Sequence, residues 1–117
     1  MTSRRWMPPA LWAALILVLT SMPAPPDVTD GIPHLDKVVH FLLYAGQAWL
    51  VTRALRTRRP RSLLAALLVI AVFGAFDEWH QQLFARTPSF VDWIADVIGA
   101  SVGIAVASRV HPVETAQ

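Results

Sequence analysis

Four apolar stretches dominate the chain, and short charged segments separate them. They cover residues 8–22, 38–55, 62–82 and 90–108. At about 1.5 Å rise per residue, the last three can cross a hydrocarbon core of about 30 Å as helices, and the first needs tilt or local thinning. With 55% hydrophobic residues in 117, the chain is too apolar for a soluble domain of this size. We predict one all-α integral membrane domain over residues 1–117, an up-and-down bundle of four transmembrane helices.

The nine prolines agree with these limits, because a proline inside a helix removes a hydrogen bond and clashes with the preceding turn. Pro8 and Pro9 open the first stretch, and the others lie in connections or beside later boundaries. We expect the first stretch to remain as a helix rather than to be cleaved as a signal peptide. Cleavage after Ala24 would place Met22 where a small residue is required.

The basic residues orient the bundle. Only Lys37 and Arg86 lie on one side of it, and eight of the ten lie on the other: Arg4, Arg5, Arg53, Arg56, Arg58, Arg59, Arg61 and Arg109. Because basic loops are retained in the cytoplasm, both termini are predicted to be cytoplasmic in a multi-pass protein of the plasma membrane. The arginine-rich rim suits anionic lipid head groups, and no nucleic-acid partner is expected. The absence of cysteine excludes disulfides and thiolate metal sites.

The acidic residues gather on the opposite, outer side. Glu114 alone lies inside, and the other seven are Asp27, Asp30, Asp36, Asp77, Glu78, Asp92 and Asp96. The positive-inside rule does not explain this distribution, because carboxylates contribute little to topology. The pattern indicates a role for carboxylates on the outer face.

Polar residues form one stripe on each of the last three predicted helices, at about 100° per residue. In chain order the stripes contain Asp36, His40 and Gln47 with Tyr44 beside them, then Gly74, Glu78 and Gln81 with Asp77 and Gln82 to either side, then Asp92, Asp96, Gly99 and Gly103. The polar part of every stripe faces the same membrane surface. Since ionisable groups at membrane depth usually face the bundle interior or a wet cavity, we predict one outward-facing polar pocket.

Several of these residues also have simple structural explanations. Asp36 and Asp92 could cap helices, and His40 could be an ordinary buried histidine. Glu78 is harder to explain, because a carboxylate near a helix C-terminus opposes the macrodipole and needs a cationic partner or a proton. Arg86, in the outer connection, could form a salt bridge with it or bind a phosphate.

Glycines and tryptophans at the helix surfaces have more general interpretations. Gly99 and Gly103 form a small-xxx-small face, which is typical of close helix packing. Trp79 and Trp93 near the outer boundary, and Trp6 near the inner one, are interpreted as interface anchors.

Three segments together resemble the VanZ-like family of small bacterial membrane proteins, named after an accessory teicoplanin-resistance protein. The segments are Asp36-Lys37-Val38-Val39-His40-Phe41-Leu42-Leu43-Tyr44, then Asp77-Glu78-Trp79-His80-Gln81, and then Arg86-Thr87-Pro88-Ser89 with Asp92 through Asp96 to Gly99. The resemblance implies a bacterial plasma-membrane protein. Its recurring ligand-binding positions would be Asp36, His40, Tyr44, Glu78, Gln81, Arg86, Asp92 and Asp96, with Gly99 as the recurring glycine. Two positions depart from the pattern: Ala85 stands where the family often has glycine, and Asp96 where it often has asparagine.

Three functions remain open at this stage. The first, favoured by the resemblance, is recognition of a lipid-linked or peptidoglycan-precursor head group, with an effect on glycopeptide (teicoplanin) susceptibility. The second is a membrane-embedded hydrolase or transferase in which Glu78 or His40 acts as general base. The third is a structural assembly bundle. No organic cofactor is expected, whereas the candidate ligands for a divalent cation are Glu78, Asp92, Asp96 and His40. Membrane lipids are the expected partners, and the sequence leaves the oligomeric state undetermined.

Overall fold

The computed structural model describes residues 2–21, 35–81 and 90–111, and this part of the chain is helical without strands. A short 3₁₀ helix, η1 (Thr2–Trp6), precedes four α-helices: α1 (Met7–Ser21), α3 (Leu35–Ala54), α4 (Pro60–Gln81) and α5 (Phe90–Val110). The predicted all-α class and the four helices are confirmed, and the limits agree within three residues. Pro8 and Pro9 lie in the first turn of α1, and Pro60 begins α4. Backbone N–H groups in the first turn have no partner within the helix, so proline, which lacks this group, is tolerated there.

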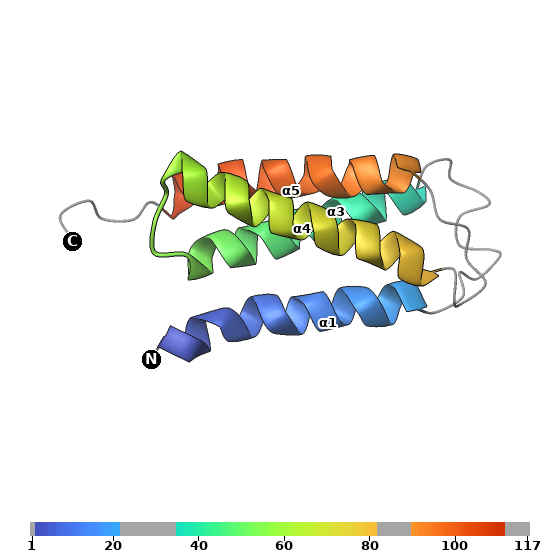
Figure 1. Cartoon of the computed structure of the whole chain (residues 1–117), viewed down its shortest axis with the longest axis horizontal. Coiled ribbons are helices and arrows are strands. Elements are labelled where there is room, and N and C mark those ends of the chain that lie inside the picture. Colours follow the sequence, from blue (N-terminus) through green and yellow to red (C-terminus); the bar gives the residue numbers. More distant parts are fainter. Residues whose placement is uncertain (1, 22–34, 82–89, 112–117) are drawn as a thin grey trace.

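The four helices run alternately up and down (Figure 1). The start of α1, the end of α3, the start of α4 and the end of α5 lie at one end of the bundle, here called the basic end. Arg58 stabilises this end: its Nη1 donates to the carbonyl of Leu55 at 3.0 Å, and its Nη2 donates to the carbonyl of His111 at 2.7 Å. The connection between α3 and α4 is thereby joined to the end of α5.

Helices α3 and α5 approach each other most closely, and glycine makes this possible. A Cβ atom on Gly99 would collide with the carbonyl oxygen of Phe41, and one on Gly103 would collide with that of Ala45. The small-xxx-small face predicted from the sequence therefore packs directly against the backbone of α3.

Helix α1 is attached to α3 through Trp12. The indole Nε1 donates to the carbonyl of Leu43 at 2.7 Å, and a Cβ on Gly46 would lie only 2.9 Å from the same indole. The apolar core continues from this contact through residues contributed by all four helices: Ile16, Tyr44, Ala48, Ile70, Ala100 and Ile104.

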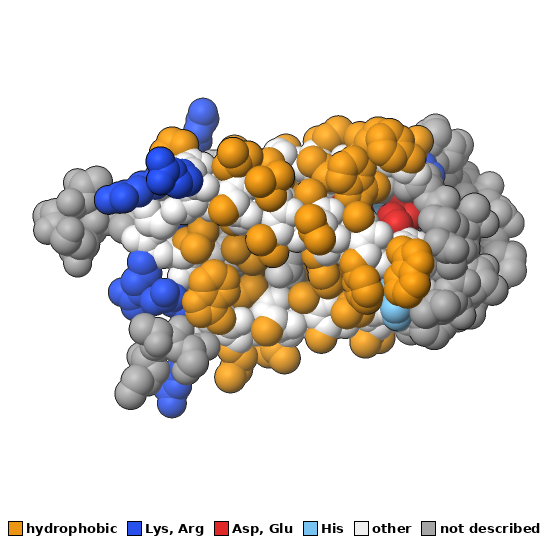
Figure 2. Space-filling model, viewed as in Figure 1, with side chains coloured by type: hydrophobic (Ala, Val, Ile, Leu, Met, Phe, Trp, Pro, Cys, Tyr) orange, Lys and Arg blue, Asp and Glu red, His pale blue; other side chains and the backbone are white. Residues whose placement is uncertain are grey.

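The bundle has apolar residues on its surface and polar ones within it. Large exposed hydrophobic side chains cover its middle, while arginines gather at the basic end (Figure 2). Both α4 and α5 are long and apolar enough to cross a membrane, yet only 22% and 39% of their most apolar windows are buried. A core helix of a soluble protein would be mostly buried. The surface is therefore suited to lipid contact.

The other two described helices do not meet this span criterion. Helix α1 has only 15 residues. The 20 residues of α3 include the inward-facing His40 and Gln47, which lower its hydropathy. The predicted arrangement of four spans with cytoplasmic termini therefore stays a prediction.

Candidate functional site

Polar side chains from three helices meet at the end of the bundle opposite the basic end. This polar cluster consists of Lys37, His40, Glu78, Asp92 and Asp96. Helices α3 and α5 begin there and α4 ends there, so the antiparallel topology brings residues distant in sequence together. His40, Glu78 and Asp92 are 4%, 6% and 7% exposed, and Asp96 is fully buried.

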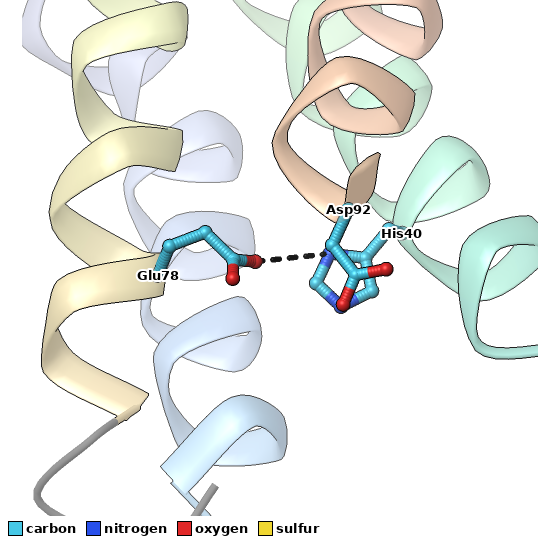
Figure 3. Close-up of side chains that lie close together, drawn as sticks. All are labelled: His40, Glu78 and Asp92. Carbon is cyan, nitrogen blue, oxygen red and sulfur yellow. Dashed lines mark ion pairs between the residues drawn. The ribbon is translucent and has the colours of Figure 1, made fainter. Parts of the chain in front are cut away.

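His40 lies within 4 Å of all three carboxylates of the polar cluster, and Figure 3 shows its ring with Glu78 and Asp92. Its Nδ1 is 2.8 Å from Asp96 Oδ1 and 3.9 Å from Glu78 Oε1, and its Nε2 is 3.8 Å from Asp92 Oδ2. Because a carboxylate oxygen accepts a hydrogen bond, Nδ1 is assigned as the protonated nitrogen that donates to Asp96. That assignment leaves the Nε2 lone pair directed to the side of Asp92.

Asp92 combines two interactions. It lies in the first turn of α5, where the macrodipole favours a negative charge. Its Oδ1 is also 3.1 Å from Nζ of Lys37, whose side chain is 31% exposed. Lys37 was not among the residues predicted for the site. The spacing of Lys37 and His40, three residues apart on one helix, is the signal that could have placed both on the same face.

Glu78 lies in the last turn of α4, where the macrodipole opposes its charge. His40 Nδ1 lies 3.9 Å from Glu78 Oε1. Arg86, the partner suggested by the sequence, lies outside the described residues, as does the side chain of Gln81. The side chain of Asp36 in α3 is also outside them.

The residue before Glu78 belongs to a different hydrogen-bonded group. Asp77 is fully buried, and its two carboxylate oxygens accept hydrogen bonds from Thr20 Oγ1 at 2.6 Å and from Tyr44 OH at 3.1 Å. We call Thr20, Tyr44 and Asp77 the Asp77 group. Thr20 was not predicted and Asp77 was placed only beside the stripe, because two adjacent hydroxyls at the end of an apolar helix form no stripe.

The carboxylate of Asp96 lies close to Gly74 of α4, which has no side chain in its way. A Cβ on Gly74 would lie 3.2 Å from Asp96 Oδ2 and 3.4 Å from the ring of Tyr44. A larger residue at this position of α4 would therefore press on both the polar cluster and the Asp77 group. Gly74, noted in the sequence as part of a polar stripe, provides this room.

Two other sequence interpretations are resolved by the structure. Gln47, on the same stripe as His40, lies away from the polar cluster and lines a largely apolar cavity of about 490 Å³ between α1, α3 and α4. Trp93 is not a simple interface anchor, because its Nε1 donates to the carbonyl of Ala71 on α4 at 2.9 Å. Trp79 and Trp6 are exposed, as expected for anchors.

Chemically, the polar cluster is acidic and shielded from water. It contains three carboxylates, one lysine and one histidine, contributed by three helices. Such a group can accept hydrogen bonds from amines and hydroxyls, and it can ligate a cation. The exposed part of Lys37 offers a positive charge at its edge.

Comparison with known proteins gives a family for the whole helical region. The family model of VanZ/LLP1 matches residues 4–111, which include every described residue of the polar cluster and of the Asp77 group. Neither the curated proteins nor the solved structures gave a match. The resemblance noted in the sequence is confirmed: the chain belongs to the VanZ/LLP1 family.

Proposed function

We propose that this chain is a multi-pass plasma-membrane protein whose polar cluster recognises the head group of a lipid-linked or peptidoglycan-precursor molecule. In this arrangement all four helices span the bilayer, the basic end is cytoplasmic and the polar cluster faces outward. The concentration of arginines at one end supports this orientation (Figure 2).

The burial of the polar cluster is the observation that carries the proposal. Ionised carboxylates within a bundle are costly, and well-packed apolar residues would often give equal or greater stability. A bundle needed only for structure has little reason to keep Glu78, Asp92 and Asp96 within 4 Å of a single histidine. Binding of a polar ligand supplies a reason.

The residue types indicate the kind of head group. Carboxylates and His40 suit the amines and hydroxyls of an amino sugar or a peptide, and Lys37 suits a phosphate at the cluster's edge. Precursors of the cell wall carry all three of these groups. Capturing them at the outer surface would change how glycopeptides such as teicoplanin reach their targets, in keeping with the name of the family.

Binding to a defined precursor tests the proposal directly. The full chain in lipid nanodiscs would be titrated with a lipid-linked disaccharide-peptide precursor and, as a control, with phosphatidylglycerol. We expect saturable binding of the precursor alone, weakened about tenfold or more by Glu78→Gln. Asp77→Asn, a change of the same kind in the adjacent buried carboxylate, should keep wild-type affinity. Equal affinity for both lipids would refute the proposal.

The susceptibility of cells provides a second readout. A bacterial host expressing the wild type, Glu78→Gln or Asp77→Asn at matched membrane levels would be assayed for growth in teicoplanin. We expect a shift with the wild type and with Asp77→Asn, and none with Glu78→Gln. If the wild type leaves growth unchanged, the role in susceptibility is wrong for this chain.

A further inference from the structure

We propose that His40, Glu78 and Asp92 bind a divalent transition-metal ion, zinc or manganese, as three protein ligands from three helices. The inference rests on the proposed function only in one respect: the remaining coordination positions of the ion are assigned to the phosphate of the head group.

The positions of the ligand atoms support an ion between the helices (Figure 3). One potential ligand atom from each of His40, Glu78 and Asp92 lies within 4.8 Å of the other two. His40 Nε2 and Asp92 Oδ2 are 3.8 Å apart, whereas two atoms bonded to one zinc ion at about 2.1 Å lie roughly 3–4 Å from each other. Glu78 Oε1 lies 3.9 Å from His40 Nδ1, so the Glu78 side chain must turn toward Nε2 to complete the set.

The hydrogen bond from His40 to Asp96 also fits metal binding. Metal-binding histidines almost always donate their other ring N–H to a carboxylate or carbonyl, which fixes the tautomer and orients the ring. Asp96 Oδ1 accepts this bond from Nδ1 at 2.8 Å, and Asp96 is fully buried. Nε2 is then the available donor, on the side of Asp92. Asp96, a candidate ligand in the sequence, is therefore assigned to positioning His40.

Lys37 does not block the site, because Asp92 has two oxygens with different neighbours. Oδ1 is 3.1 Å from Lys37 Nζ, whereas Oδ2 faces His40. The lysine thus neutralises one side of Asp92 while the other side remains turned to the ion. It also places a positive charge beside the coordination position that we assign to a phosphate.

The ligand types select the class of metal. Imidazole suits zinc, and the two carboxylates also suit manganese, whereas calcium and magnesium prefer all-oxygen sites. Three protein ligands leave at least one position open, as in zinc sites that bind a substrate, whereas structural zinc sites are closed by four. The ion would therefore be positioned to bind an oxygen of the head group.

Metal binding can be measured without any head group. The purified full chain in detergent would be stripped with a chelator and titrated with zinc, manganese, calcium or magnesium by calorimetry. We expect one equivalent of zinc or manganese per chain and much weaker binding of calcium and magnesium. Glu78→Gln and Asp92→Asn should lower the affinity about tenfold or more, and Asp96→Asn should do so by about tenfold through His40. Asp77→Asn should retain the wild-type affinity.

A spectroscopic measurement on the wild type avoids dependence on the folding of variants. Manganese bound at the proposed site should show hyperfine coupling to the ¹⁴N of His40 in electron–nuclear double resonance. Absence of binding, absence of nitrogen coupling, or an equal loss in Asp77→Asn and Glu78→Gln would each overturn the inference.

Precursor binding to the metal-free and metal-loaded protein separates this inference from the proposed function. Precursor binding that needs the metal supports both. Equal precursor binding with and without the metal overturns the assignment of the ion to the head group and leaves the proposed function standing. Metal binding without any precursor binding refutes the proposed function and leaves the metal site standing.

Discussion

Asp77 and Glu78 are adjacent carboxylates on α4, both buried, yet they belong to different groups. Asp77 accepts hydrogen bonds from two hydroxyls, one on α1 and one on α3, which link three helices. Glu78 faces a histidine and the acids of α5. Burial alone therefore does not distinguish a structural carboxylate from a candidate ligand. The groups that contact each carboxylate make the distinction. Both carboxylate oxygens of Asp77 accept hydrogen bonds from neutral hydroxyls. The polar cluster instead has the negative charge and the ligand atoms that a cation requires.

The largest effect should come from the packing that both groups share. Gly103→Leu would force a side chain into the carbonyl of Ala45 and separate α3 from α5. We expect destabilisation of about 3 kcal/mol or more, with loss of both groups together. Thermal unfolding in detergent would measure it, with the outward-facing Val102→Leu as the matched control. Normal stability in Gly103→Leu would contradict the close approach of the two helices.

Removing the carboxylate of the Asp77 group should weaken the fold and spare the proposed metal site. Asp77→Leu leaves the buried hydroxyl of Tyr44 without its acceptor, whereas Thr20 Oγ1 can still donate to the carbonyl of Ile16 at 2.9 Å. The expected loss of unfolding free energy is about 2 kcal/mol. Metal affinity, measured below the unfolding temperature, should change less than about threefold. A tenfold loss of metal affinity would mean that the two groups act as one.

Glu78→Gln should have the opposite signature. The side chain keeps its volume and loses its negative charge, so we expect a metal affinity at least tenfold weaker, equivalent to about 1.4 kcal/mol. The unfolding free energy of the metal-free protein should change by less than about 1 kcal/mol. The substitution removes a buried negative charge near the negative end of the helix dipole, which offsets the loss of its contacts. Destabilisation as large as that of Asp77→Leu would assign Glu78 to structure.

Thr20→Val should give the smallest change. This nearly isosteric substitution removes one donor to Asp77 and leaves Tyr44 in place. Interhelical hydrogen bonds in membrane proteins contribute about 0.6 kcal/mol on average, so we expect a loss of about 1 kcal/mol or less. Comparing Thr20→Val, Asp77→Leu and the double variant would give the coupling energy. Strict additivity would show that this hydrogen bond contributes nothing.

Much of the fold was predictable because its rules are local. Hydrophobic runs, proline positions and a 3.6-residue period placed the four helices, and alternation of direction brought the polar stripes to one end. The same reasoning grouped His40 with Glu78, Asp92 and Asp96, which the structure places within 4 Å of it. These residues lie on the expected faces because a helical face depends only on spacing along the chain.

The pairing of individual groups was not predictable, because it depends on how the helices rotate and approach one another. The sequence alone determined an apolar surface, a basic end and an acidic end. Only the tertiary structure decided that Asp96 orients His40, that Asp77 binds Thr20 and Tyr44, and that Lys37 meets Asp92. The physical reason is that spacing sets the face of a residue, whereas the glycine contacts between α3 and α5 set which atoms come within bonding distance across helices.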